Sequence, residues 1–307
     1  MDPIDLSKIK TYSLKDRESK EKLADAVKVP ASDSVADLIA GLPNVLKAKD
    51  FRALVKALVK ARDAKKTIIW MMGAHVVKCG LTPIIVDLAE NGFVSHVATN
   101  GAGAIHDFEL AYHGETSEDV TVTIQDGSFG LADETGGFLS ETMKIAAEKG
   151  SGYGEMLGCR MEDEDLPHKA GSLFWNLHRL GIPATVHVCI GTDIINQHPE
   201  FSGAAAGEAT FTDFRILAAS VATMEGGAIL NIGSSVVLPE VFLKTLSIAR
   251  NLGHTVEDFT AANFDMIGHY RAITNVLARP TGGWGYDIRG HHEIMIPLLA
   301  AALRAGG

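Results

Sequence analysis

The stretch HVATNGAGAIHDFE, residues 96–109, decides how the rest of the chain is interpreted, because it joins a β-branched apolar segment directly to a glycine turn. Gly101 and Gly103 supply two glycines of a GxGxxG dinucleotide fingerprint, and His106 stands where the third glycine would be. The fingerprint also needs an acid after the next strand. Asp126 has a suitable spacing, but an acidic stretch intervenes. We therefore reject the standard fingerprint and keep the interpretation of a glycine-turned nucleotide site.

The same alternation of a strand and a helix extends over most of the chain. Continuous apolar runs predict buried strands, and amphipathic segments between them predict helices. The expected strands are 67–75, 93–99, 182–193, 228–235 and 257–265. The expected helices are 80–92, 170–181, 211–227, 238–253 and 293–305. This order predicts an α/β fold with a doubly wound, mostly parallel sheet covered on both faces.

Two regions depart from this alternation. Residues 1–66 are predicted to form an N-terminal helical arm packed on the main domain, with Pro43 interrupting apolar residues at helical spacing. Residues 67–307 form the main α/β domain. Within it, residues 114–166 are acidic and rich in glycine, and are expected to be an insertion with one helix at about 138–149. Such an insertion could be an active-site lid, an oligomer contact or a solvated excursion.

Composition narrows the class of protein. The chain has 307 residues, 46% hydrophobic and 21% charged, which is typical of globular proteins. Its net charge is -10, and the basic residues between 47 and 66 suit the exposed face of a helix, so nucleic acid is not an expected partner. No CxxC occurs among three cysteines, and no apolar run could span a bilayer. We expect a cytoplasmic protein without a membrane partner or a bound metal.

Small and polar residues follow every predicted strand, where ligands bind in open parallel sheets. The expected cofactor-binding residues are Ala74, His75, Cys79, Thr99, Asn100, Gly101, Gly103, Asp107, Gly233, Ser234, Ser235 and Asn263. His106 and Asp193 are expected to take part in catalysis, with Asp193 also able to hold a ribose group. This coincidence across five strands is stronger than any single motif.

The segment RPTGGWGYDIRGHH, residues 279–292, is too glycine-rich for a helix and unusually rich in reactive side chains. Arg279 could hold a carboxylate or phosphate with its planar guanidinium group. His291 could act as an acid or base near neutral pH. The expected substrate-binding residues are Arg279, Trp284, His198, His292 and Glu293. The alternative is a capped helix N-terminus beside an exposed loop.

The order of these motifs resembles that of deoxyhypusine synthase and its wider NAD-binding superfamily, over residues 67–302. The corresponding turns are Ala74–His75 with Cys79–Gly80, the TNGAGAIHD stretch, Gly233–Val237, Asn263–Phe264 and Pro297–Leu299. The NGAGAIHDFE stretch is also similar to the NAD-dependent ornithine cyclodeaminase domain of archaea and cyanobacteria. The resemblance implies bound NAD, a homotetramer, and transient oxidation of a C–N or C–O carbon.

One departure from the family limits what this resemblance implies. Deoxyhypusine synthase uses a lysine in a Trp-Gly-Lys context, and the nearest counterpart here, ARPTGGWGYD, offers Arg279 and Trp284 instead. We therefore expect an NAD-dependent enzyme of the transferase or lyase type, acting on a small polar amine or amino acid. One alternative is a metal-dependent hydrolase or lyase using His198, Asp193 and a histidine of the 291–292 pair. The other is a nucleotide-binding protein without catalysis.

Overall fold

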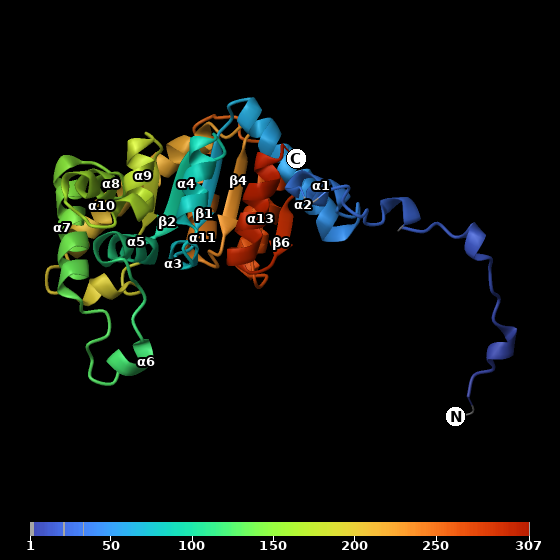
Figure 1. Ribbon diagram of the computed structural model, residues 1–307, viewed down its shortest axis with the longest axis horizontal. Helices are drawn as coiled ribbons and strands as arrows, with labels where there is room; N and C mark the ends of the chain where they lie inside the picture. The colour runs from blue at the N-terminus through green and yellow to red at the C-terminus, as the bar shows by residue number, and fades with distance from the viewer. Residues whose placement is uncertain (1–2, 21, 33, 307) are drawn as a thin grey trace.

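A computed structural model describes residues 3–20, 22–32 and 34–306, and places six parallel strands in one sheet. The strands lie in the order β3-β2-β1-β4-β5-β6 (Figure 1). Their bounds are β1 Ile68–Met72, β2 His96–Asn100, β3 Ala184–His187, β4 Ala228–Ile232, β5 Thr260–Asp265 and β6 Tyr286–Arg289. All five pairings are parallel, which confirms the predicted doubly wound α/β fold.

Helices cover both faces of this sheet and connect successive strands. The main helices are α1 Val35–Gly41, α2 Leu46–Asp63, α3 His75–Lys78, α4 Thr82–Glu90, α5 Gly101–His113, α9 Leu173–Arg179, α10 Gly203–Ala222, α11 Val237–Asn251 and α13 His292–Arg304. In Figure 1, α4 and α13 lie in front of the strands and α11 lies behind them. The predicted helices at 80–92, 170–181, 238–253 and 293–305 match α4, α9, α11 and α13 within a few residues.

Alternate residues of each strand enter separate hydrophobic cores on the two faces. Trp70 and Met72 of β1 pack in the core that also contains residues of α2, α4 and α13. Ile69 and Met71 face the opposite core, which contains residues of α10 and α11. Because both faces of the sheet are buried, these strands read as unbroken apolar runs. The Trp70 indole nitrogen donates to the carbonyl of Phe93 at 2.9 Å, so its polar atom is also satisfied inside the core.

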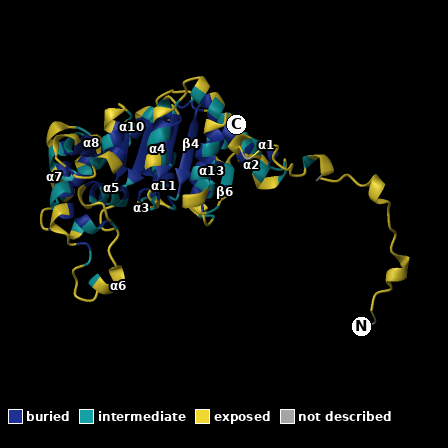
Figure 2. Cartoon of the chain, viewed as in Figure 1, coloured by how far each residue is buried: buried dark blue, intermediate teal, exposed yellow. Residues whose placement is uncertain are grey.

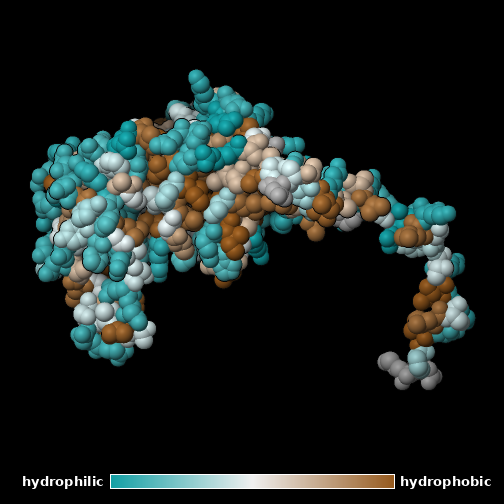
Figure 3. All heavy atoms as spheres, in the orientation of Figure 1, coloured by the Kyte–Doolittle hydropathy of each residue, from teal (hydrophilic) through white to brown (hydrophobic). Residues whose placement is uncertain are grey.

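The N-terminal segment before α1 extends away from the body of the protein (Figure 1). It holds three short 3-10 turns, η1 Leu6–Lys8, η2 Leu14–Asp16 and η3 Leu23–Asp25, with no buried residue in any of them. Its apolar side chains are exposed, as the yellow trace in Figure 2 and the brown groups in Figure 3 show. In contrast, α2 buries Phe51, Leu54 and Leu58 against the sheet. Within the described residues, no helix has both the length and the apolar composition needed to cross a membrane.

Residues 114–166 divide into two structurally different parts. Residues 114–132, called the projecting segment below, carry α6 Val120–Thr123, which has no buried residue (Figure 1). They are followed by α7 Asp133–Lys149 and α8 Tyr153–Asp163, which contribute Leu139, Met143 and Leu157 to the larger core. Only the first part therefore has the character expected of an excursion. The division of the chain into an arm and a main domain stays a prediction.

The sixth strand and helix α8 were not predicted from the sequence. β6 has only four residues and pairs with β5 alone at the edge of the sheet, so the apolar run that reveals the other strands is absent. Before it lie the π-helical segment η6 Ala272–Ala278 and a single helical turn, α12 Arg279–Thr281. The expectation that residues 279–292 are too glycine-rich for a helix is thus wrong for the single turn Arg279–Thr281. α10 also begins eight residues before the predicted helix.

A buried carboxyl group on α10 makes the stability of this fold depend on pH. Asp213 is fully buried and accepts N–H bonds from Val186 at 2.7 Å and Gly154 at 3.0 Å. Burial raises the pKa of Asp213 to about 8, although these hydrogen bonds lower it. Because the folded pKa exceeds the unfolded one, folding binds a proton, and the stability gained below the unfolded pKa is lost as pH rises towards 8.

We therefore expect the wild-type protein to lose stability relative to Asp213→Asn as pH rises from 4 to 8. The slope of the difference should approach ~1.4 kcal/mol per pH unit at most, since one proton is involved. Asparagine keeps a neutral group of the same shape and cannot titrate. Urea unfolding of both proteins across this range measures the difference, and parallel pH profiles would contradict the prediction.

Candidate functional site

The strand order reverses between β1 and β4, and the loops after these two strands lead to helices on opposite faces of the sheet. In open parallel sheets, ligands bind at such a point beyond the carboxyl ends of the strands. The two loops approach closely, since a Cβ on Gly73 would lie 2.3 Å from the carbonyl oxygen of Gly233. Gly233 itself has φ +68, and a Cβ there would lie 2.5 Å from Nε2 of His292. Glycine is therefore required at both positions where the two loops meet, which we call the switch point.

Buried polar atoms without hydrogen-bond partners lie near this switch point. The described residues offer no hydrogen-bond partner to Nδ1 of His292, Oδ2 of Asp265 or Oδ1 of Asn231. The rings of His75 and His292 lie 6.2 Å apart, edge to face. Burial lowers the pKa of His292, partly offset by the negative charge of Asp265. Unpaired buried polar atoms cost about 1–3 kcal/mol each, so these three atoms are candidates for hydrogen bonds to a ligand or to water.

A chain of hydrogen bonds connects the ends of β4, β5 and β6. Asn231 donates to Asn263 at 2.8 Å, Asn263 donates to Asp287 at 3.0 Å, and Arg289 pairs with Asp287 at 2.9 Å. Asn231 also donates to the carbonyl of Ser234 at 2.9 Å, which holds the loop after β4. The predicted cofactor residue Asn263 is therefore buried within the sheet, and its oxygen and amide both have partners in the protein.

The glycine turn at the start of α5 is closed by the protein's own side chains. Asn100 accepts the N–H of Gly103 at 3.2 Å. The carboxylate of Asp193 lies against Gly101, where a Cβ would stand 2.0 Å from its Oδ2, and it accepts the N–H of Ala102. Asp193 thus occupies the helix N-terminus that the sequence predicts as a phosphate site. Burial raises the pKa of Asp193 to about 6.

A cavity of about 530 Å³ opens beside this helix, under the projecting segment before α7. It combines the cation Lys78 with the carboxylates Glu109, Glu118 and Asp193, and it includes His106. Apolar side chains complete its wall: Ile105, Val120, Phe129, Leu131 and Ile194. Gln197 donates to the Phe129 carbonyl at 2.7 Å and ties the segment to the body of the protein, while Gly130 donates to Glu118 at 2.7 Å within the segment.

His106 is a titratable group in the wall of this cavity. Its Nδ1 lies 2.7 Å from the hydroxyl of Thr116, which donates a short hydrogen bond to Glu109. Burial lowers the pKa of His106, and the positive charges of Lys78 and His75 lower it further. The imidazole is therefore neutral at physiological pH and able to accept a proton. Helix α3 carries both Lys78, which lines this cavity, and His75, which lies beside His292 at the switch point.

Several predicted site residues instead hold the fold together. Asp107 is buried and accepts bonds from the Ser172 hydroxyl at 2.5 Å and the N–H groups of Leu173 and Phe174, so it caps α9. Burial raises its pKa to about 6. Thr99 donates to the carbonyl of Met72 at 2.8 Å and thereby links β2 to β1.

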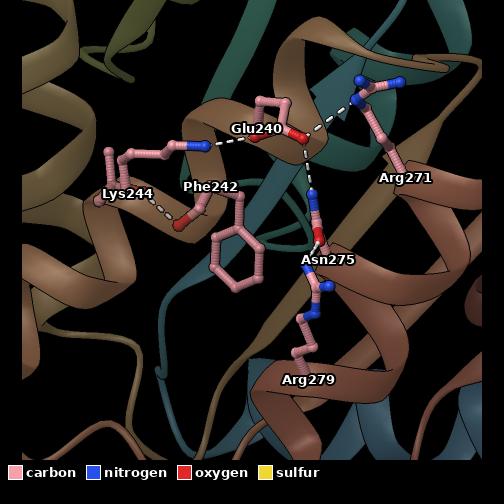
Figure 4. Close-up of polar contacts among 7 residues, drawn as sticks. Glu240, Phe242, Lys244, Arg271, Asn275 and Arg279 are labelled. Carbon is pink, nitrogen blue, oxygen red and sulfur yellow. Dashed lines mark hydrogen bonds and ion pairs between the residues drawn. The ribbon is translucent and has the colours of Figure 1, made fainter.

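Arg279, the predicted substrate clamp, belongs to a polar cluster outside the cavity (Figure 4). It donates to Asn275 at 2.7 Å, Asn275 donates to Glu240 at 2.9 Å, and Glu240 also pairs with Arg271 and Lys244. This cluster ties η6 and α12 to α11. The guanidinium group of Arg279 is thus held by Asn275 within the protein.

The remaining predicted residues are dispersed. Trp284 is 85% exposed. His291 and Glu293 are exposed and lie 3.7 Å apart at the start of α13. Cys79 is half-buried, and burial followed by the charge of Glu293 raises the pKa of its thiol. His198 is buried against Gly136, with Nε2 unpaired among the described residues.

The structure adds two residues that the sequence did not single out. Asn231 lies inside β4, where an asparagine among apolar residues was the available signal. Thr116 lies in the projecting segment, and no sequence pattern predicts its contact with His106. In the described ranges, no group of three or more His, Cys, Asp or Glu side chains is arranged to hold a metal ion. The set formed by Asp193, His198 and the 291–292 pair is therefore not assembled.

These features define an α/β fold with a β3-β2-β1-β4-β5-β6 sheet, the strand order of dinucleotide-binding folds. Neither a family model nor a curated protein matches the sequence. Solved structures do match. A conserved LOR/SDH protein from Methanococcus maripaludis S2 is 14% identical, with a TM-score of 0.52 over 85% of this chain and 70% of that one.

Two further structures match at similar distance. AgrE, solved in complex with ornithine and NAD+, is 16% identical with a TM-score of 0.53, over 85% of this chain and 34% of AgrE. A putative deoxyhypusine synthase from Entamoeba histolytica is 12% identical with a TM-score of 0.50, over 87% and 91% of the two chains. The chain thus spans about a third of AgrE. At these identities the shared property is the fold, as the resemblance implied.

Proposed function

We propose that this protein is an NAD-dependent enzyme that transiently oxidises a small polar amine or amino acid. The observation that carries the proposal is His106, whose pKa is lowered by burial, in the wall of a polar cavity that also contains Lys78 and Glu118. AgrE, which shares the fold, was solved with NAD+ and ornithine. The charges of the cavity suit a zwitterion, because Lys78 can pair with a carboxylate and Glu118 with an ammonium group.

The residues around the loops after β1 and β4 fit a dinucleotide. Gly73 and Gly233 expose the backbone of both loops, and His75 and His292 lie where phosphate oxygens could accept their N–H groups. Ser235 is half-buried beside them. Because Asp193 already occupies the start of α5, we place the phosphates between the loops after β1 and β4. Gly101 and Gly103 then serve to pack Asp193 and Thr99.

The chemistry divides between the cofactor and the protein. Bound NAD would accept a hydride from the carbon that carries the substrate nitrogen and later return it. His106 would take the proton released from the nitrogen, because its neutral ring can accept one. Lys78 and Glu118 would orient the substrate, and the projecting segment would exclude water from the cavity.

Thermal unfolding with and without NAD+ tests the cofactor. At a concentration one hundred times the dissociation constant, a bound ligand adds about 2.7 kcal/mol to the unfolding free energy. The melting temperature should therefore rise on the order of 5 °C. Mass spectrometry of small molecules released from the purified protein checks for NAD carried through purification. No nucleotide and no thermal shift would overturn the proposal.

Further measurements on the purified protein distinguish the proposed function from its alternatives. Offering a panel of amino acids and amines should produce transient absorbance of reduced cofactor. Binding of NAD+ without any hydride exchange would favour a nucleotide-binding protein that does not catalyse. Stoichiometric zinc in the purified protein would favour the metal-dependent hydrolase or lyase. A cytoplasmic homotetramer stays a prediction by analogy with the resembled superfamily.

A further inference from the structure

The projecting segment contributes more than a cover to the cavity, because one of its side chains contacts the base directly. Thr116 lies ten residues after His106, beyond the end of α5, and its hydroxyl oxygen is 2.7 Å from Nδ1 of the histidine. The same hydroxyl contacts Oε2 of Glu109. The other carboxylate oxygen of Glu109 accepts a hydrogen bond from Thr135 at 3.3 Å. Four side chains from α5, the segment and α7 therefore form one continuous chain.

The donors and acceptors of this chain can be assigned from chemistry alone. An ionised carboxylate only accepts hydrogen bonds, so the single hydroxyl proton of Thr116 must point to Glu109. The contact between Thr116 and His106 then requires a proton on the ring, because the threonine has no second proton to donate. The ring must therefore donate through Nδ1. In a neutral imidazole this leaves Nε2 unprotonated.

We infer that Thr116 is a positioning residue which, through Glu109, fixes His106 as the tautomer protonated on Nδ1 and leaves Nε2 free as the proton acceptor in the cavity. Nδ1 of His106 has a hydrogen-bond partner among the described residues, and Nε2 of the same ring has none there. The inference rests on the proposed function for the use of Nε2 in catalysis. The tautomer itself is a property of the protein without substrate or cofactor.

This arrangement links the base to the position of the segment. Ser117 and Glu118, the next two residues, line the cavity, and Glu118 binds the N–H of Gly130 at the far end of the segment. Because Thr116 belongs to the segment, displacing the segment from the cavity would remove the partner that selects the tautomer of His106.

The test is nitrogen NMR of the imidazole rings in protein labelled with 15N-histidine, at a pH where His106 is neutral. The signal of His106 is assigned by its loss in His106→Asn. We expect the wild-type ring to show a protonated Nδ1 and an unprotonated Nε2. Thr116→Val removes the hydroxyl at nearly constant shape and should mix the two tautomers. Thr116→Ser keeps the hydroxyl and should restore the wild-type pattern.

Thr121→Val is the matched control, since Thr121 is exposed on the same segment and no described residue pairs with its hydroxyl. Its spectrum should be unchanged. A wild-type ring protonated on Nε2, or a Thr116→Val spectrum identical to wild type, would overturn the inference. Because the spectra need no NAD, a protein that fails to bind NAD but shows these tautomers would overturn the proposed function and leave the inference standing.

Discussion

His106→Asn is expected to lower turnover by about 10²–10⁴-fold, the usual contribution of a positioned acid or base, while NAD+ binding is retained. The asparagine amide can take the place of Nδ1 and keep the contact with Thr116, so the fold around the cavity should persist. It has no atom that replaces Nε2 as a proton acceptor. The loss should therefore fall on the chemical step.

The measurement is the rate of cofactor reduction with the best substrate of the panel, together with the NAD+ thermal shift. His113→Asn is a control on the same helix, because His113 is an exposed residue of the last turn of α5 and does not line the cavity. It should turn over at the wild-type rate. Full activity of His106→Asn with normal NAD+ binding would make His106 a packing residue.

Gly73→Ala is expected to destabilise the protein by about 1–3 kcal/mol and to remove the stabilisation by NAD+. The new methyl group would lie 2.3 Å from the Gly233 carbonyl oxygen and 2.9 Å from its carbon. Both are backbone atoms in the middle of the sheet, where Gly73 also donates to the Ile232 carbonyl at 2.8 Å. No flexible side chain can move aside, so the loops after β1 and β4 must separate.

Gly137→Ala is the matched control for this substitution. Gly137 lies inside α7, and a Cβ there would meet nothing within 4 Å. Alanine at a helix interior is favoured over glycine by roughly 0.5–1 kcal/mol, so the control should be at least as stable as wild type. Urea unfolding and NAD+ thermal shifts of both variants decide the matter. A Gly73→Ala protein with wild-type stability and an unaltered shift would show that the two loops are not in tight contact.

How well each strand or helix could be predicted from the sequence depended on how local its sequence signal is. The strands β1, β2 and β4 were predicted because they are buried on both faces and consist mainly of apolar or small residues. The edge strand β6 has an exposed residue and lies behind a glycine-rich turn, so its pattern resembles a loop. Helix α8 was missed because its glycines resemble turn residues, although Gly154 and Gly158 are needed for close packing on β3 and α9.

The candidate site shows the same limit more sharply. His106 was predicted from the stretch that surrounds it, and the structure places it in the cavity. Asp107, its neighbour, had the same local evidence, but its partner Ser172 is 65 residues away and makes it a helix cap. Arg279 has the chemistry of a clamp, yet the guanidinium group is held by Asn275.

The alternation of strands and helices, the parallel sheet and the glycine turn that begins α5 could all be inferred from the amino-acid sequence. These follow from burial and backbone freedom, which each residue type expresses locally. In contrast, long-range packing places Asp193 in that turn and Thr116 beside His106. It also brings the loops after β1 and β4 together. Such contacts join residues far apart in the chain, and a side chain does not encode which of several possible partners the fold will bring to it.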